Sequence, residues 1–325
     1  MIVAASQDPA PLTALDLFTS WRPDPLALLL ALLLGGGYLW ARRRVATWPR
    51  ARSLAFYGVG LGSLLLVSVT FVGVYDDVLF WARSTQIIVL LMVTPLGLAM
   101  GGPLSLLRQG LGEGGRARLD RAVASRGVRL ATHPAAGSVL MLTLPWLLYF
   151  TAWYPTVLRN SSIDALTRLA VVAVGFVYFY GRLQLDPVPR RYSHLIAFTI
   201  SLTEVIFDAA LGLVLWLGPL VAMDYYAALG RSWGPSLRDD QIYGAGILWI
   251  GGDLAGLPFL GALLRRMIAT DSEEAAEVDR RLDEAETPPT IPTGQANPDP
   301  PPSRPRLWWE EDPQLSERFH RSGSP

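Results

Sequence analysis

Seven apolar stretches dominate the chain, and each is long enough to cross a bilayer as a helix. A hydrocarbon core of about 30 Å requires roughly 20 residues of helix. The stretches fall at 25–41, 53–75, 78–100, 137–155, 163–185, 195–222 and 241–267. The sixth is long and contains Gly218-Pro219, so we expect it to be tilted or bent. The pattern predicts an all-α, polytopic membrane protein built as a seven-transmembrane-helix bundle.

Composition agrees with this class. Hydrophobic residues make up 51% of the 325 positions and charged residues 17%, below the roughly 25% of an average soluble protein. The basic residues other than histidine are all arginine, and they are unevenly distributed. Loops 42–52, 101–136 and 182–194 hold fourteen arginines, whereas the opposite side holds four. Because cytoplasmic loops are rich in basic residues, we expect the N-terminus outside and the C-terminus inside a bacterial cytoplasmic membrane.

The two ends of the chain differ from the bundle. Residues 1–24 lack the basic start and apolar core of a cleaved signal peptide, and we assign them to an external segment. Residues 268–286 are highly charged and predict a cytoplasmic helical extension. Residues 287–325 are rich in proline and predict a disordered tail. Two adjacent tryptophans near its end leave open a short docking motif for a cytoplasmic partner or the membrane surface.

Polar side chains inside the predicted spans form the candidate site. A charge at bilayer depth costs on the order of 2.5–3.5 kcal/mol, and such residues usually face the bundle interior and pair with one another. The set comprises Arg83, Gln86, Asp164, Arg168, Glu204, Asp208 and Asp253. Asp164 and Arg168 are four residues apart, as are Glu204 and Asp208, so each pair occupies one helix face.

Depth along the spans separates this set into two groups. We expect Arg83, Asp164 and Arg168 to share a layer near the outer surface, with Glu204 and the other acids nearer the middle. One hypothesis is a polar cavity that binds an ion, a metal or a polar cofactor. The alternative is an ion-paired core that fixes how the helices pack. Asp253, flanked by glycines that permit close helix approach, fits this alternative.

Metal and enzyme chemistry find little support in the residues themselves. The chain has no cysteine, and its histidines, His133, His194 and His320, fall in predicted inner loops or the tail. A soft copper site at membrane depth therefore has poor ligands. Phosphate-binding, zinc-protease and serine-hydrolase motifs are absent. We expect neither an enzyme nor a nucleic-acid-binding protein, and no cofactor follows from the residues.

Four stretches together resemble one known family. The third predicted span contains QIIVLLMVTPLGLAMGGPLSLL, and the fourth begins HPAAGSVLMLTLPWLLYFT. DPVPRR follows the fifth span, and YYAALGRSWGPSLRDDQIYGAGILWIGGDLAGLP leads into the seventh. The matching positions in these stretches include Gln86, Pro95, Asp186, Pro187, Asp240, Gln241 and Trp249. Over roughly residues 50–270 the chain is similar to the CtaG family of cytochrome c oxidase assembly factors, seven-helix bacterial membrane proteins.

The resemblance implies a partner, namely the subunits of a respiratory haem–copper oxidase, and a family role in placing copper in that oxidase. The family's third helix usually carries a pair of histidines, and the corresponding positions here are Arg83 and Ile87. A similar pair in its fifth helix matches Asp164 and Arg168, and a histidine of its sixth falls at or near Asp208.

These substitutions change the chemistry that the resemblance implies. The family's seventh helix also has glutamate where this chain has Asp253. Imidazole binds copper, whereas guanidinium only donates hydrogen bonds. We therefore expect an oxidase assembly factor whose copper ligands are replaced by an Arg/Asp ion-pair network. The alternatives are a diverged structural or regulatory membrane subunit, or a proton or cation transporter.

Overall fold

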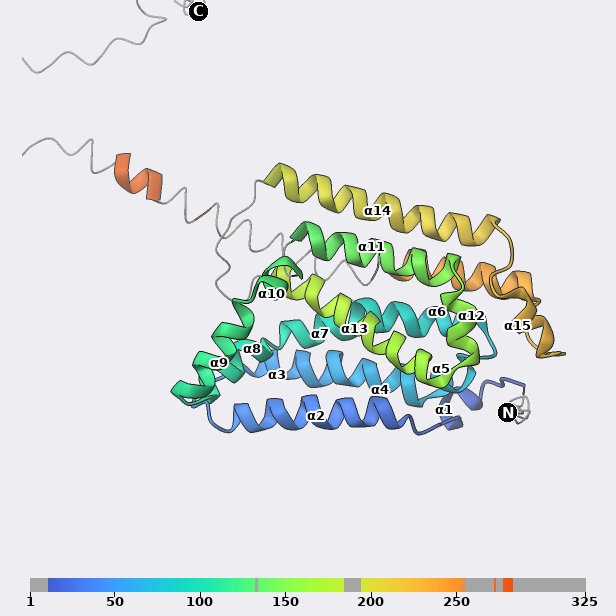
Figure 1. Ribbon diagram of the computed structural model, residues 1–325, viewed down its shortest axis with the longest axis horizontal. Coiled ribbons are helices and arrows are strands. Elements are labelled where there is room, and N and C mark those ends of the chain that lie inside the picture. Colours follow the sequence, from blue (N-terminus) through green and yellow to red (C-terminus); the bar gives the residue numbers. More distant parts are fainter. Residues whose placement is uncertain are drawn as a thin grey trace, which may run out of the picture. The chain divides into compact units, whose positions relative to one another are not determined.

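The computed structural model describes residues 11–131, 134–183, 194–252, 254, 272 and 277–282. These residues form helices joined by turns and short loops, without a strand, so the protein is all-helical. The chain divides into two units, Met1–Ile268 and Ala269–Pro325. Figure 1 shows the helices of the first unit lying side by side as a bundle.

The elements of the first unit follow one another closely along the chain. In order they are α1 (Asp16–Thr19), α2 (Pro25–Arg42), α3 (Arg50–Leu54), the π-helical η1 (Ala55–Leu61), α4 (Gly62–Val69), α5 (Phe71–Tyr75), α6 (Phe80–Ile88), the π-helical η2 (Val89–Val93), α7 (Thr94–Met100), α8 (Pro103–Gly110), α9 (Glu113–Val123), α10 (Arg126–Ala131), α11 (Pro134–Phe150), α12 (Trp153–Arg159), α13 (Ser161–Leu183), α14 (His194–Leu217) and α15 (Met223–Ala228). A last helix covers residues 237–252.

Several of these helices are candidate membrane spans. Within the described part of the chain, the segments long and apolar enough to cross a membrane are Pro25–Arg42, Arg50–Val69, Phe80–Gly110 and Ser161–Leu183. A fifth span results if Ala135–Phe150 and Trp153–Arg159, bent by 69° at their junction, are counted together. The predicted span 241–267 contains residues that lie outside the described part. Seven spans and the orientation of the termini therefore remain predictions.

Two predicted spans end earlier than the apolar pattern indicates. The span expected at 53–75 is interrupted at Thr70, whose backbone is extended, with a ψ of −168°. The span expected to continue to residue 222 leaves the helix at Leu217, the last residue of α14. Pro219 lacks the amide hydrogen that would continue the helical pattern, so Gly218-Pro219 ends this helix.

Helices η1, α7 and α13 cross at the centre of the bundle with their backbones in contact. A Cβ on Gly97 would lie 2.3 Å from the amide nitrogen of Gly60, and one on Gly175 would lie 2.1 Å from the carbonyl oxygen of Leu91. Pro95 has no amide hydrogen to donate to that carbonyl, which lies four residues earlier in η2. Glycine at these positions is what permits the close crossing.

The second unit is described only in part. Residues 277–282 are helical, and Glu277 pairs there with Arg280 and with Arg281, the latter at 3.0 Å. These contacts lie within the predicted extension 268–286. The predicted tail, residues 287–325, lies outside the described residues.

Candidate functional site

Arg83 of α6 lies at the centre of a buried group of charged side chains. We call this group the Arg83 cluster, and its members are Asp24, Asp76, Arg83, Asp164 and Arg168. The Nη1 atom of Arg83 is 2.6 Å from Oδ1 of Asp164 on α13 and 3.6 Å from Oδ2 of Asp76. Its Nε donates to the backbone carbonyl of Asp76 at 3.2 Å, and only 3% of the residue is exposed. The charge is therefore balanced by two carboxylates on separate elements.

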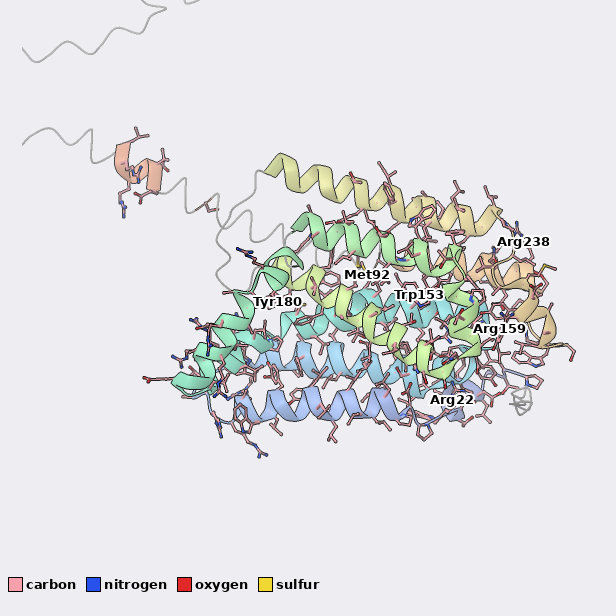
Figure 2. The ribbon with its side chains drawn as sticks, viewed as in Figure 1. Arg22, Met92, Trp153, Arg159, Tyr180 and Arg238 are labelled. Atoms are coloured by element: carbon pink, nitrogen blue, oxygen red, sulfur yellow. The ribbon has the colours of Figure 1, made fainter. Side chains whose placement is uncertain are left out.

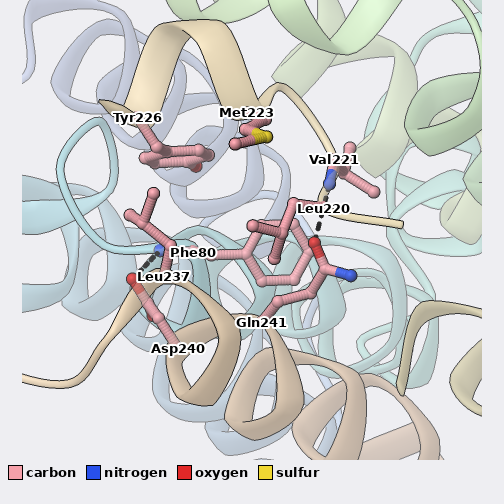
Figure 3. Close-up of a pocket in the computed structure, with 8 residues that line it drawn as sticks. All are labelled: Phe80, Leu220, Val221, Met223, Tyr226, Leu237, Asp240 and Gln241. Atoms are coloured by element: carbon pink, nitrogen blue, oxygen red, sulfur yellow. Dashed lines mark hydrogen bonds between the residues drawn. The ribbon is translucent and has the colours of Figure 1, made fainter. Parts of the chain in front are cut away.

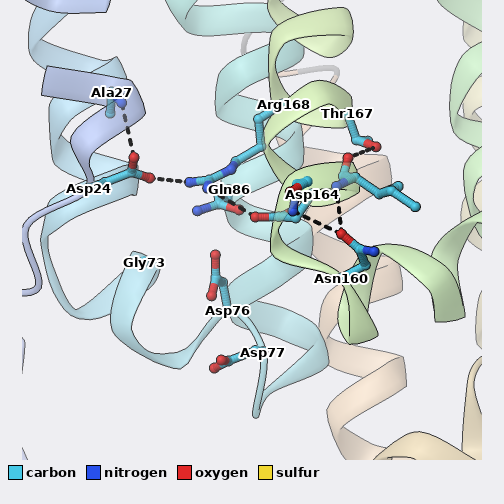
Figure 4. Close-up of polar contacts among 12 residues, drawn as sticks. Asp24, Ala27, Gly73, Asp76, Asp77, Gln86, Asn160, Asp164, Thr167 and Arg168 are labelled. Carbon is cyan, nitrogen blue, oxygen red and sulfur yellow. Dashed lines mark hydrogen bonds and ion pairs between the residues drawn. The ribbon is translucent and has the colours of Figure 1, made fainter. Parts of the chain in front are cut away.

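Arg168 extends the cluster to the first long helix. Its Nη2 lies 3.0 Å from Oδ2 of Asp164, and its Nη1 donates to the carboxylate of Asp24 (Figure 4). Asp24 also accepts a hydrogen bond of 3.0 Å from the amide of Ala27 and so caps α2, with Pro25 in the first helical position. The same ion pairs that neutralise Arg168 thus join α2 to α13.

Gln86 connects the cluster to the break at Thr70. Its Oε1 accepts from Arg83 at 3.0 Å, and its Nε2 donates to the carbonyl of Val67 at 3.2 Å. The last carbonyls of a helix have no partner in the helix itself. Because α4 ends at Val69, its last carbonyls have no donor within the helix. The backbone amide of Arg22 donates to the Val69 carbonyl at 2.9 Å. The buried Gln86 therefore links the end of α4 to the Arg83 cluster through hydrogen bonds.

The turn between α5 and α6 adds charge at the rim of the cluster. Arg22 contacts Asp76 at 3.3 Å and Asp77 at 3.8 Å. Burial of its carboxylate raises the pKa of Asp77, and the neighbouring charge of Asp76 raises it further. Figure 4 shows both aspartates on the side of the cluster away from α13.

A second polar group lies further along α13, and we call it the Arg182 cluster. It joins α11, α13 and α14 through Ser138, Tyr178, Arg182 and Glu204. Arg182 is 2.6 Å from Oε1 of Glu204 and donates to the hydroxyl of Ser138 at 2.9 Å. The hydroxyl of Tyr178 donates to Oε2 of Glu204 at 3.0 Å. Asp208, one helical turn further along α14, is partly buried.

Asp240 caps a helix that lies far from it in the sequence. Its two carboxylate oxygens accept from the amide of Phe80 at 3.1 Å (Figure 3) and from the amide of Trp81 at 3.0 Å. These are the first amides of α6, which have no partner within the helix, and no side chain next to Phe80 caps them. Arg231 lies 3.3 Å from the same carboxylate. Burial raises the pKa of Asp240, and the two amide bonds and Arg231 oppose that rise.

Gln241 fastens the loop between α14 and α15. Its Oε1 accepts from the amide of Val221 at 2.7 Å (Figure 3), and its Nε2 donates to the carbonyls of Leu215 and Pro219 at 2.8 and 3.0 Å. Pro219 cannot donate to the Leu215 carbonyl four residues before it, so the glutamine amide takes the place of the missing backbone donor. Trp249, on the same last helix, packs directly against Gly212 of α14.

The structure divides the sequence-predicted residues into groups. It brings together Arg83, Gln86, Asp164 and Arg168, and it places Glu204 in the separate Arg182 cluster. Asp253, Asp186 and Pro187 lie outside the described residues. Asp240, Gln241, Pro95 and Trp249 fix helix ends and crossings.

Sequence reasoning missed three partners, Asp24, Asp76 and Arg182. Arg182 was counted with the arginines of loop 182–194, and it lies in the last turn of α13, within the predicted span 163–185. Asp24 had a usable signal, since an aspartate followed by proline commonly starts a helix. The Asp76-Asp77 doublet between two apolar runs was a second signal, because two adjacent acids at a span end call for cations.

The Arg83 cluster does not fit a copper ion. Its donors are guanidinium groups, which cannot coordinate a metal, and carboxylates that already accept from those groups. In the described part of the chain, no group of three or more His, Asp or Glu side chains is arranged to hold a metal ion. What the cluster does chemically is neutralise buried charge and tie helices together.

Comparisons with known proteins place the chain in a family. It is 26% identical over 287 residues to an uncharacterized protein of Mycobacterium leprae and 27% identical to one of Mycobacterium tuberculosis (strain CDC 1551 / Oshkosh). Each match covers 85% of this chain but 43% of the relative, so the chain spans less than half the length of these relatives. No solved structure matches it. Residues 35–270 match the family described as cytochrome c oxidase caa3 assembly factor (Caa3_CtaG), and the chain belongs to that family.

Proposed function

We propose that the chain is a non-enzymatic accessory protein for the assembly of a haem–copper cytochrome c oxidase, and that it acts by contacting oxidase subunits. It works in the bacterial cytoplasmic membrane as a seven-span bundle, with the N-terminus outside and the C-terminus in the cytoplasm. Family membership supports the oxidase partner. The apolar helices support the membrane location, and the arginine distribution supports the orientation.

One observation carries the proposal that copper handling does not take place at the Arg83 cluster. Where the family resemblance places copper-binding histidines, this chain has Arg83, Asp164 and Arg168, and these side chains bind one another. A cation entering the cluster would have to displace buried ion pairs, because the carboxylates there already bind guanidinium groups. In our proposal the Arg83 cluster stabilises the packing of α2, α6 and α13, and the oxidase is recognised elsewhere on the protein.

The arrangement of charge along α13 also favours a structural role over transport. No charged residue occurs between Arg168 and Arg182. Val171 and Phe179 in this interval are buried in the apolar core. The two polar clusters are therefore separated by packed apolar side chains, which supports two separate braces.

Gentle affinity purification of the full chain from native membranes tests the proposed partner. We expect oxidase polypeptides to be recovered with it, and their reproducible absence would contradict the proposal.

A separate measurement tests whether the protein binds copper. After mild loading, the purified protein should hold under about one-tenth of an equivalent of copper, because hard, already paired ligands bind it poorly. A stoichiometric, tightly bound copper ion would overturn the proposal that copper is not handled at the Arg83 cluster.

A further inference from the structure

One end of the bundle carries a dense set of exposed and partly exposed arginines. They occupy the end of α2, the α2–α3 loop, α3 and helices α8 to α10, at the end of the bundle away from α12 and α15 (Figure 1). We call this set the basic face; its members are Arg42, Arg43, Arg44, Arg50, Arg52, Arg108, Arg116, Arg118, Arg121 and Arg126. Only two acids, Glu113 and Asp120, lie in the same segments, 42–52 and 103–128.

The segments that carry these arginines are fastened to one another. Trp48 of the α2–α3 loop donates to the hydroxyl of Tyr38 at 2.8 Å, and that hydroxyl donates to the carbonyl of Gly101 at 3.0 Å. Helix α9 is held on α8, because Arg108 binds Asp120 through two hydrogen bonds of 2.8 and 3.2 Å. The arginines therefore belong to one continuous, ordered surface.

Most charges of this surface have no counterion among the described residues. In the segments described there, Arg108 is the one arginine that forms an ion pair, with Asp120. At the opposite end, by contrast, Arg22, Arg83 and Arg231 each pair with an aspartate. Arginines gathered so densely repel one another, so binding of anions to this surface is favourable.

The exposed Trp40 supports a position of the basic face near the lipid headgroups. Trp40 lies in the last turn of α2, a candidate span, and is 40% exposed, as expected for a side chain at the boundary between hydrocarbon and water. The guanidinium carbon of Arg44 lies 4.0 Å from the centre of its ring, and that of Arg52 lies 5.0 Å from the ring of Trp48. Arg44 is thus held next to an exposed tryptophan at the end of a candidate span, and the planar donors of guanidinium groups match phosphate oxygens.

We propose that the basic face binds the phosphate groups of anionic lipids in the adjoining leaflet. Helix α9 then lies along the membrane surface, with Arg118 and Arg121 contributing to the binding. Arg43 of the α2–α3 loop and Arg50 at the start of α3 supply a second part of the same surface. This interaction is independent of the oxidase partner proposed above.

Native mass spectrometry of the purified full chain tests this proposal. The protein in detergent is titrated with phosphatidylglycerol and, separately, with phosphatidylcholine of the same acyl chains. We expect tighter binding of phosphatidylglycerol, and a weakening by about fivefold for each surface arginine removed. Arg118→Gln/Arg121→Gln and Arg43→Gln/Arg50→Gln should each lose affinity for the anionic lipid and keep their affinity for phosphatidylcholine.

Two controls separate charge from structure. Arg159→Gln removes an exposed arginine at the opposite end of the bundle, labelled in Figure 2, and should leave lipid binding unchanged. Arg118→Lys/Arg121→Lys keeps the charge and should retain the preference for phosphatidylglycerol.

Several outcomes would overturn the proposal. They are equal affinity for the two lipids, and equal loss of affinity in the control and in the α9 variant. Displacement of phosphatidylglycerol by inorganic phosphate at the same concentration would assign the surface to a free anion. Displacement by polyglutamate, together with weak lipid binding, would assign it to an acidic protein.

Discussion

Arg83 and Asp164 are 81 positions apart in the chain and form an ion pair of 2.6 Å between α6 and α13. The guanidinium group also contacts Asp76, and the carboxylate also contacts Arg168. Each charge therefore has two partners of opposite sign. In a medium of low dielectric constant such mutual compensation is what makes burial of either group tolerable.

Removing the cation should be far more damaging than removing an exposed arginine. Arg83→Leu leaves two carboxylates without their shared partner, and we expect a loss of about 3–5 kcal/mol in the free energy of unfolding. Thermal unfolding of the purified protein in detergent measures this, with Arg159→Gln as the exposed control. Adding Asp76→Asn and Asp164→Asn to the Arg83→Leu variant should recover part of the loss. Equal melting temperatures for Arg83→Leu and the control would contradict a bracing role.

The crossing of α13 with η2 and α7 allows a matched comparison of two glycines. A Cβ at Gly175 would meet the Leu91 carbonyl oxygen at 2.1 Å, whereas one at Gly36 would meet nothing within 4 Å. Gly175→Ala must force the helices apart, so we expect a large fall in melting temperature or failure to accumulate in the membrane. Gly36→Ala should be neutral or stabilise by up to about 1 kcal/mol, since alanine favours helix. Similar behaviour of the two variants would show that the crossing is looser than described.

The sequence predicted the all-helical class because long apolar runs dictate it, and it identified Arg83, Gln86, Asp164 and Arg168 because charges stand out within such runs. It did not predict that Asp24 and Asp76 complete the cluster. Both lie at the ends of apolar runs, where a charge looks solvated, and only the tertiary arrangement brings them next to buried arginines.

Helix ends were harder to predict than helix existence. Hydropathy continues past Thr70 and Leu217, yet the helices stop there. In each case the carbonyls left by the early stop are bound by side chains from elsewhere, Gln86 at the first and Gln241 at the second. Such long-range replacements for backbone hydrogen bonds leave no periodic pattern in a single sequence.

Asp77 should make stability depend on pH. Burial raises the pKa of Asp77, so its carboxylate binds a proton more tightly in the folded state than in the unfolded state, where the pKa of aspartate is about 3.9. The contribution of Asp77 to stability therefore falls as pH rises through the interval between the unfolded and folded pKa values. Asp77→Asn removes the cost of burying the charged carboxylate. The variant should therefore be more stable than the wild type at neutral pH and equally stable in acid.

The gain from Asp77→Asn should be small. The side chain is 41% exposed, and Arg22 at 3.8 Å offsets part of the cost, so we expect about 1 kcal/mol or less at neutral pH. Melting temperatures of both proteins across a pH series measure the difference. A variant less stable than the wild type at neutral pH would show that the pairing with Arg22 outweighs burial.

Gln241 offers the sharpest test of a side chain that replaces backbone donors. Gln241→Leu keeps a similar volume but leaves the Val221 amide and the Leu215 and Pro219 carbonyls without this partner, and we expect a loss of about 2–4 kcal/mol. Gln109→Leu, on the exposed side of α8, is the matched control and should change stability little. Gln241→Glu retains the acceptor for Val221 but places a buried carboxylate oxygen against the two carbonyls, so its loss should be at least as large as that of Gln241→Leu. If Gln241→Glu had the same melting temperature as the wild type, the hydrogen bond from the Gln241 side-chain amide to the Leu215 carbonyl would not contribute to stability.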